Sequence, residues 1–432
     1  MTKLNSNIIH ESFFYLILFL PIAYVLGNLA INMTIFLIDI YFLVNLAIIK
    51  KYDFRSKILK LSLIIGALLI AHSLILNIEY THKAIFYLRF FIFPFALSYV
   101  IEKNYLKLNL LKHFYIIFIL LFSVDLFLQF KTGQNILGFD LKTINGYPNH
   151  EISSDELKNF RVSSRVSGLM GDELGAGAVL LVFGLISILF LNNLQSKKEI
   201  IFTICSFLII LFFIFITGDR SPVIIFICFI IFLNFFIHQI RKYFFHFIII
   251  LGILIYLIFS FSPVTKYRYI DNPIELTNNK EKLFSKNKLK NILTTDWGKH
   301  YLVSLEMIKD KPLFGHGIKS SRSKCKNFIK YLDEKYRLRA CSTHPHNILL
   351  EILVDTGVVG LFILLFLVFK YFQIIYTKDK NKLFRTSNKM IFLLLLAFIL
   401  PIKPSGSIFS TWYGSLPWLI AGFAITRSKL KV

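Results

Sequence analysis

Long apolar runs are the feature that most constrains the fold of this chain of 432 residues. Hydrophobic residues make up 56% of the sequence and gather in stretches of about 18 residues or more, the length of a membrane-spanning helix. About twelve such stretches lie near residues 12–29, 31–49, 58–77, 84–101, 113–130, 173–193, 200–217, 222–238, 244–262, 346–370, 389–403 and 409–426. The first is too long for the apolar core of a signal peptide and is expected to remain as a helix. The sequence therefore predicts an all-α polytopic membrane protein with about 12 transmembrane helices.

The positive charges indicate how the chain is oriented in the membrane. The net charge is +24, and Lys and Arg gather in every second short connection between the apolar runs. Because cytoplasmic loops collect these residues, both termini are expected in the cytoplasm. The expected organisation is helices one to five in 1–130, a first outer segment in 131–171, helices six to nine in 172–262, a large outer loop with short helices in 263–345, and three C-terminal helices in 346–432.

The large outer loop is strongly basic, and its charges have two interpretations. The lysines between Lys280 and Lys290 are typical of a flexible, solvated run. The cations nearer His346 favour a positive field that attracts anionic lipid head groups or diphosphates. The apolar spacing from Trp297 to Met307 predicts an amphipathic helix on or near the membrane. Residues 311–317 predict a turn whose glycines allow close backbone approach.

The chain has four cysteines. Cys205 and Cys228 fall within apolar runs, where a cysteine usually packs as a small side chain. Cys325 and Cys341 share the large hydrophilic segment, and a disulfide between them is plausible if that segment is extracytoplasmic. No Cys/His spacing resembles a zinc site, so no metal is expected.

The stretch from His344 to Gly360 marks the passage from the outer loop to a membrane helix. Pro345 suits the first position of a helix, which would make His344 the N-cap and place His346 and Asn347 in the first turn. The positive end of the helix dipole disfavours imidazolium, so a histidine there would stay neutral and able to accept a proton. The alternative is that the proline only starts the helix and the histidines are interfacial.

Two acidic residues, Glu351 and Asp355, follow within this apolar run, four positions apart. Acids inside a membrane helix are candidates for function. One of them could orient a histidine. The other interpretation is a structural hydrogen bond to a neighbouring helix.

Arginines occur at two predicted helix ends on the same side. Arg220 lies in a very short outer connection, and Arg165 precedes the sixth apolar run. Each is either an interfacial side chain that reaches water or a clamp for a diphosphate, whose oxygens a guanidinium matches in a bidentate manner. Further cations near the glycine-rich turn are His316, Lys319 and Arg322.

The spacing after His346 resembles that of a known family. His346-Asn347 is followed by nine residues, then by Gly357, and two residues later by Gly360. This pattern resembles the motif of the O-antigen ligase and O-antigen polymerase superfamily of bacterial envelope glycosyltransferases. Three segments that resemble the family occur in the same order, at 165–171, 217–220 and 312–317, and the resemblance covers roughly residues 160–425.

The resemblance implies an activity. Such enzymes move a glycan from undecaprenyl diphosphate to an acceptor hydroxyl on the periplasmic face of the inner membrane, with inversion of the anomer and without a metal or other cofactor. It implies His346 as general base, Arg220 as diphosphate ligand and Arg165 as a weaker candidate of the same kind. Supporting roles fall to His344, Asn347 and Glu351, and one of His316, Lys319 and Arg322 would complete the diphosphate site.

The acceptor is left open by the resemblance. The superfamily joins glycans to lipid A–core, to a growing glycan or to protein, and the stretches at 217–221, 341–347 and 403–407 slightly favour polymerase-type members. A lipid-linked oligosaccharide transporter is the alternative of a different class, which predicts charges around a mid-membrane cavity and often a repeat. The candidate charges instead gather on one side and no repeat is visible. No nucleotide-binding motif is visible, and no nucleic-acid partner is expected.

Overall fold

The computed structural model describes residues 3–49, 54–140, 165–171, 173–261, 263–266, 269–270, 293, 295–377 and 382–426. In these residues the regular secondary structure is helical and contains no strand, so the all-α class is confirmed for them. The lysine-rich run 280–290 lies outside the described residues. The α-helices are α1 (Lys3–Leu26), α2 (Asn28–Ile49), α3 (Phe54–Leu76), α4 (Thr81–Lys103), α5 (Leu108–Thr132), α7 (Ala176–Leu189), α8 (Lys197–Thr217), α9 (Arg220–Phe236), α10 (His238–Arg241), α11 (Phe244–Phe261), α12 (Pro263–Lys266), α15 (Asp296–Asp310), α16 (Ser320–Lys324), α17 (Glu334–Arg337), α18 (Ile348–Thr377), α19 (Lys382–Ile399) and α20 (Trp412–Ala424).

Eight helices of the described chain are long and apolar enough to cross a membrane, namely α1 to α5, α8, α11 and α18. Shorter apolar helices are α7, α9 and residues 386–399 of α19. A helix overlaps each of the expected apolar runs, and the total of twelve crossings stays a prediction. The short α7 is buried along its whole length, because protein surrounds it on every side.

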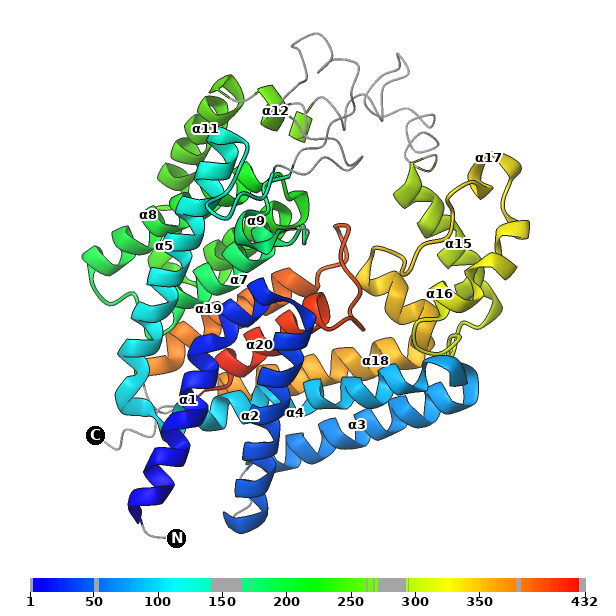
Figure 1. Ribbon diagram of the computed structural model, residues 1–432, viewed down its shortest axis with the longest axis horizontal. Coiled ribbons are helices and arrows are strands. Elements are labelled where there is room, and N and C mark those ends of the chain that lie inside the picture. The colour runs from blue at the N-terminus through cyan, green and yellow to red at the C-terminus, as the bar shows by residue number, and fades with distance from the viewer. Residues whose placement is uncertain are drawn as a thin grey trace.

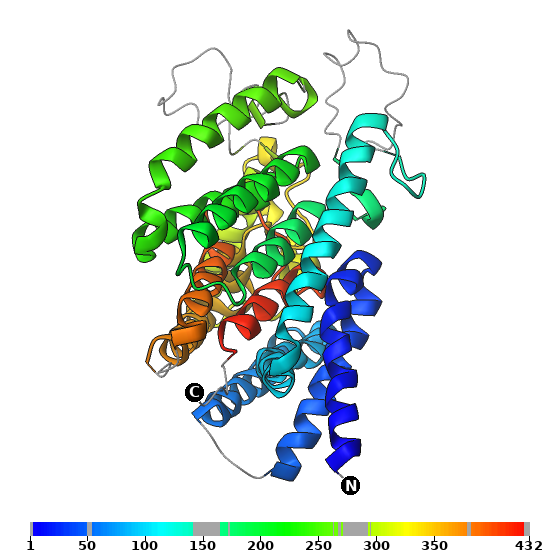
Figure 2. The same cartoon turned by 90° about the vertical axis from the view of Figure 1, so that its left-hand side faces the viewer.

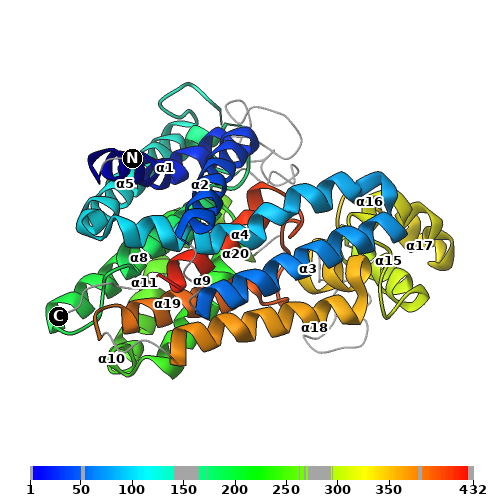
Figure 3. The same cartoon turned by 90° about the horizontal axis from the view of Figure 1, so that it is seen from below.

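The helices gather into two groups that meet along α4, α7 and α20. In one group α3, α4 and α18 lie side by side and extend toward the segment that carries α15, α16 and α17 (Figures 1 and 3). In the other, α7, α8, α9 and α19 pack together, and α1 runs beside α5 (Figure 2). The α15–α17 segment lies at the side of the molecule away from the start of α1 (Figure 1).

The predicted amphipathic helix in the outer loop is α15. Its buried residues Val303 and Met307 pack in a small apolar cluster with Cys325 and Val354. The amphipathic pattern that indicated a membrane surface therefore reflects packing of α15 on its own loop and on α18.

The helix α18 is interrupted at Gly357, whose φ is 66° and ψ is −167°. A continuous helix would bond each N–H to the carbonyl four residues earlier. Here the carbonyls of Val354 and Asp355 instead accept from the backbone N–H groups of His316 and Gly317, each at 2.9 Å. On the other side of the break, the N–H groups of Val358 and Val359 donate to Pro312 and Leu313 at 2.9 and 3.1 Å. The 311–317 turn is thus inserted into the broken backbone of α18.

Glycines make this insertion possible. A Cβ at Gly357 would lie 2.3 Å from the Leu313 carbonyl oxygen, and a Cβ at Gly315 would lie 2.7 Å from the backbone of α18 at Asp355. A Cβ at Gly360 would lie 1.9 Å from Thr356 Oγ1. Gly357 and Gly315 therefore serve the junction between the helix and the turn, whereas Gly360 packs against Thr356 of α18 itself.

Substitution of Gly357 tests this junction. Gly357→Ala places a side chain in a left-handed conformation and against Leu313, so we expect a lower melting temperature, with roughly 1–3 kcal/mol lost to backbone strain alone. Gly252→Ala in α11 is the control, because its Cβ meets nothing within 4 Å. Alanine in a helix is favoured over glycine, so the control should be neutral or stabilising. Equal melting temperatures for both variants in detergent would contradict the role of Gly357.

Candidate active site

The motif histidine lies just before α18. The helix begins at Ile348, and the Asn347 side-chain oxygen accepts from the Leu350 N–H at 3.2 Å, which makes Asn347 the N-cap. The prediction that His344 caps the helix and that His346 lies in its first turn is therefore wrong. An asparagine side chain is a better cap acceptor than a histidine ring, and the helix starts correspondingly later. His346 adopts a left-handed backbone with φ 57°, an unusual conformation for a residue with a side chain.

The imidazoles of two other histidines lie beside that of His346. Its ring centroid lies 4.1 Å from that of His344 and 5.3 Å from that of His300, and its Nε2 lies 3.1 Å from Ser342 Oγ. His300 donates from Nδ1 to the Ala340 carbonyl at 2.8 Å. His300 was missed by the sequence reasoning. The signal that could have found it is its place on the same helical face as the buried residues of α15.

The surroundings keep the His344 and His346 rings neutral at physiological pH. Burial, followed by the nearby His300, lowers the pKa of His346 to about 4. Burial, followed by the nearby His346, lowers the pKa of His344 to about 3. The expected neutral state of His346 thus rests on desolvation and on like-charged neighbours, and the helix dipole is not needed for it.

The connection between α19 and α20, residues 400–408, runs beside this cluster. The Ser405 N–H donates to the His346 carbonyl at 2.8 Å, and His344 Nε2 lies 3.2 Å from the Ser405 carbonyl. One residue earlier, the Pro404 carbonyl accepts from Ser221 Oγ at 2.5 Å. Ser221 follows Arg220 at the start of α9, so the 400–408 connection brings Arg220 and His346 into one region.

The two predicted arginines meet at Asp219. Arg165 lies 3.6 Å from an Asp219 oxygen, and Arg220 is the next residue in sequence. The charges of the two guanidinium groups are close enough to interact. The second Asp219 oxygen accepts from the Gly177 N–H at 3.0 Å, which fixes Asp219 to the N-terminus of α7.

Arg165 is held in place from α5. The side-chain oxygen of the fully buried Gln129 accepts from the N–H groups of Ser167 and Gly168 at 3.0 and 2.7 Å. Beside them, the Val166 N–H donates to the Thr217 carbonyl at 3.2 Å. The segment that carries Arg165 is therefore anchored both to α5 and to the end of α8.

The three candidate loop cations have different positions. His316 is buried and donates from Nε2 to the Met307 carbonyl at 2.9 Å, and burial lowers its pKa. Arg322 is exposed on α16. Lys319 is buried, hydrogen-bonds Ser407 of the 400–408 connection and lies 3.8 Å from Glu351. Of the three, only Lys319 hydrogen-bonds this connection in the described chain.

The two acids of α18 hold loops. Glu351 accepts from Ser407 Oγ at 2.5 Å and from the Ile408 N–H at 2.8 Å. Asp355 accepts from the N–H groups of Lys319 and Ser320 at 2.8 and 3.1 Å. Neither carboxylate bonds a histidine among the residues that the structure describes, so the interpretation that one orients a histidine is not supported. The alternative, a structural hydrogen bond, describes both.

Cys325 and Cys341 form a disulfide in the structure, with their Cα atoms 5.8 Å apart. Cys341 lies between Ala340, which accepts from His300, and Ser342, which hydrogen-bonds His346. The disulfide therefore ties the segment that supports His346 to the end of α16. Cys205 is exposed and Cys228 is half-buried, and both are free thiols.

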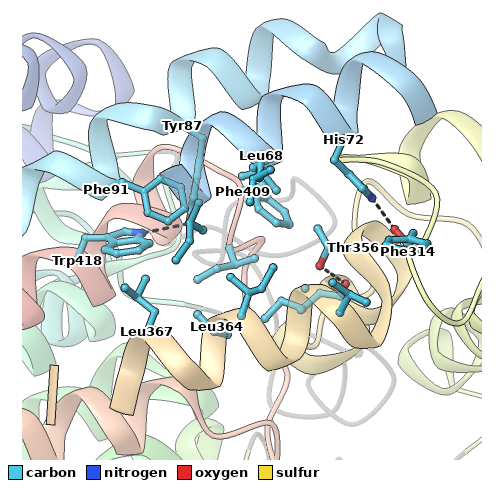
Figure 4. A pocket seen from close by; sticks show the side chains of 17 residues that line it. Leu68, His72, Tyr87, Phe91, Phe314, Thr356, Leu364, Leu367, Phe409 and Trp418 are labelled. Carbon is cyan, nitrogen blue, oxygen red and sulfur yellow. Dashed lines mark hydrogen bonds between the residues drawn. The ribbon is translucent and has the colours of Figure 1, made fainter. Parts of the chain in front are cut away.

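An apolar cavity of about 290 Å³ lies between α3, α4 and α18. Phe91 and Trp418 line one end, and Phe314 and Thr356 line the other, where α18 is broken (Figure 4). Most polar atoms in the wall bond to protein: Thr356 Oγ1 donates to the Ile352 carbonyl at 2.8 Å, Trp418 Nε1 donates to Tyr87 Oη at 3.0 Å, and His72 Nε2 lies 2.6 Å from the Phe314 carbonyl oxygen. The buried His72 Nδ1 has no hydrogen-bond partner among the described residues. The cavity therefore presents an apolar surface suited to a hydrocarbon chain.

Together these features define a helical, multi-pass membrane protein. Its candidate site contains the half-buried motif histidine and, linked to it through the 400–408 connection, the start of α9 with Arg220. Residues 205–365 match the family model described as O-Antigen ligase. The matched range contains Arg220, His346 and both motif glycines, but not Arg165. The family resemblance predicted from the His346–Gly360 motif is thereby confirmed for this part of the chain.

A second comparison agrees with the first. A stretch of 78 residues is 37% identical to a protein of Rickettsia conorii (strain ATCC VR-613 / Malish 7) that carries the provisional name polysaccharide ligase. The stretch covers 17% of this chain and 18% of that relative. The chain thus matches less than a fifth of the relative's length. Both comparisons support a general role in joining glycans.

The buried pair of Lys319 and Glu351 gives a test of how the site is held. Glu351→Gln leaves the Lys319 charge buried without its partner, so we expect a loss of about 3–5 kcal/mol of stability, seen as a lower melting temperature in detergent. Adding Lys319→Met should restore part of the loss, because it removes the orphaned charge.

The matched control is Glu306→Gln. Its partner Lys309 is exposed and lies 2.6 Å away, so this ion pair should contribute only about 0–1 kcal/mol. A Glu351→Gln variant that is as stable as Glu306→Gln would show that the Lys319–Glu351 pair does not hold the 400–408 connection.

Proposed function

We propose that the protein transfers a glycan from undecaprenyl diphosphate to an acceptor hydroxyl on the periplasmic face of the bacterial inner membrane. The observation that carries the proposal is the 400–408 connection, which hydrogen-bonds His346 through Ser405 and the residue after Arg220 through Pro404. A base and an anion-binding cation are the two groups that this transfer needs.

In the proposed reaction, His346 accepts the proton of the acceptor hydroxyl as its oxygen attacks the anomeric carbon of the donor glycan. The bond from the anomeric carbon to the diphosphate oxygen breaks, and undecaprenyl diphosphate leaves with the anomer inverted. In the unliganded chain His346 Nε2 lies 3.1 Å from the Ser342 hydroxyl, whose place the acceptor hydroxyl would take in this reaction.

Arg220 binds the departing diphosphate and stabilises the negative charge that develops on it. Arg165, which pairs with the neighbouring Asp219, supports Arg220 in this role. Lys319 is the loop cation linked to the histidines, because it hydrogen-bonds Ser407 of the same 400–408 connection. With these fixed cations, the proposed transfer needs no metal. A guanidinium suits the diphosphate because it can bind two of its oxygens at once.

The apolar cavity between α3 and α18 is the proposed place for the first isoprene units of the lipid. It ends at Thr356 and Gly360, beside the break in α18 and close to the motif. Because its wall is apolar, the cavity argues against the transporter alternative, which requires charges around a mid-membrane cavity.

The proposed topology keeps both termini in the cytoplasm, with twelve crossings and with residues 131–171 and 263–345 in the periplasm. The disulfide between Cys325 and Cys341 supports this orientation, because disulfides form in extracytoplasmic compartments. The proposed acceptor is lipid A–core or a growing glycan, with protein as the alternative within the superfamily. The glycan pattern of a deletion strain distinguishes them: a single repeat on core indicates a polymerase, whereas naked core with lipid-linked polymer indicates a ligase.

The site assignment is tested with His346→Ala, Arg220→Ala and Arg220→Lys. We expect each to reduce release of undecaprenyl diphosphate by the purified protein, and His346→Ala by about 10²–10⁴-fold as its general base is lost. Arg220→Lys should not restore activity, because an ammonium cannot bind two oxygens in a fork. The assay is run in EDTA. Full activity in all three variants, or a strict requirement for a metal, would contradict the mechanism.

The pH dependence tests the protonation state of His346. A base must be neutral to act, and the pKa of His346 is lowered to about 4, so activity should persist at mildly acidic pH and fall only as the pH drops through about 4. An unperturbed histidine would already lose activity near a pH of about 6.5. The measurement is kcat/KM between a pH of about 3.5 and 8. An acid limb near the unperturbed value would argue against His346 in this environment as the base.

A further inference from the structure

His300 is a buried histidine outside the motif, on the inner face of α15. Its Nδ1 donates to the Ala340 carbonyl at 2.8 Å, and its ring lies 5.3 Å from that of His346 with an interplanar angle of 28°. Because a carbonyl can only accept, this contact places the proton of the neutral His300 ring on Nδ1. The side chain is only 8% exposed. A buried imidazole with a fixed tautomer is therefore stacked on the proposed base.

We propose that His300 is a positioning residue that orients the His346 ring. The inference rests on the proposed function, because it takes His346 as the base of the transfer. His300 itself is placed to act on His346 and on the segment that precedes it. No role in binding the glycan or the diphosphate is assigned to it.

The orienting contacts of His346 come from both sides of Cys341. On one side His300 holds Ala340, and on the other Ser342 hydrogen-bonds His346 Nε2. The disulfide to Cys325 fixes the middle of this three-residue stretch. The backbone of His346 is held independently, by Ser405. The ring of the base is thus supported by α15, and its backbone by the 400–408 connection.

Several elements bring titratable or charged groups to the histidine cluster. His300 faces His346 from α15, and His344 faces it from the same segment. From the 311–319 region, Lys319 faces His344, and Glu351 of α18 partly offsets its charge. The 400–408 connection contacts His344 and His346 through the backbone of Ser405. Among these groups, the charge that disfavours imidazolium at His346 is that of His300.

Two variants of the full-length protein separate the contacts of His300. His300→Phe keeps a ring to stack on His346 but removes the donor to Ala340 and the ionisable group. His300→Asn keeps a donor near the position of Nδ1 but removes the ring and the ionisable group. The control is His113→Phe, at an exposed position on α5.

For His300→Phe we expect kcat to fall by on the order of tenfold or more, because a misplaced base slows the chemical step, with KM for the lipid-linked donor within about twofold. The acid limb of the pH profile should move to higher pH, because the His300 charge that helps to lower the pKa of His346 is removed. The same upward shift is expected for His300→Asn, with a smaller loss in kcat, and His113→Phe should match the unchanged protein.

A second readout does not need enzymatic activity. Of the two protonation forms of an imidazole, diethyl pyrocarbonate modifies only the neutral one. Mass spectrometry of the peptide that contains His346, after modification at a series of pH values, therefore reports the protonation of His346. We expect the midpoint of modification to move to higher pH in both His300 variants. If the unchanged protein releases no undecaprenyl diphosphate, the proposed function fails, and this midpoint still decides the role of His300.

The inference is overturned if the midpoint for His346 and the value of kcat are the same in His300→Phe as in the unchanged protein. Gel filtration in detergent checks that each variant is folded. If His300→Phe does not fold, the role of His300 is decided with His300→Asn, from the midpoint of His346 modification and the acid limb of the pH profile. This variant also removes the ionisable group, and it keeps the donor to Ala340.

Discussion

The break in α18 at Gly357 is the constraint on which the rest of the site depends. A break within a membrane helix exposes backbone groups, and each such group costs several kcal/mol if it stays unpaired in lipid. Four backbone hydrogen bonds to the 311–317 turn satisfy these groups. The turn can therefore lie in only one place. The residues that follow it, from Lys319 to Cys325, are positioned relative to α18 as a consequence.

From this junction the site is assembled by contacts that run along the chain in both directions. Asp355, just before the break, binds the start of α16, and the disulfide at the end of α16 reaches the segment that precedes His346. Glu351, one turn earlier, binds the 400–408 connection, which reaches both His346 and the start of α9. Polar side chains within α18 thus serve to place loops, and the proposed mechanism assigns the chemistry to residues outside the helix.

Part of this arrangement could be predicted from the sequence. Apolar runs of membrane length fixed the helical class, because lipid allows few other structures. The spacing from His346 to Gly357 and Gly360 identified the family segment. Other features depend on contacts between distant residues and left no local pattern. His300 contacts His346 only because α15 packs on its own loop. The 400–408 connection links α9, which begins at Arg220, to the histidines only once α9, α18 and α19 are packed. The prediction of His344 as the N-cap was wrong because it relied on Pro345 as the first helical residue, whereas Asn347 has the better capping side chain.

The most direct test of a shared site for His346 and Arg220 is a cryo-EM structure of the unchanged protein with an undecaprenyl-diphosphate-linked glycan. If the assignment is right, the diphosphate will contact Arg220, the first sugar will lie beside His346, and the lipid will enter the apolar cavity between α3 and α18. A diphosphate bound away from Arg220, with His346 facing neither sugar nor acceptor, would contradict it.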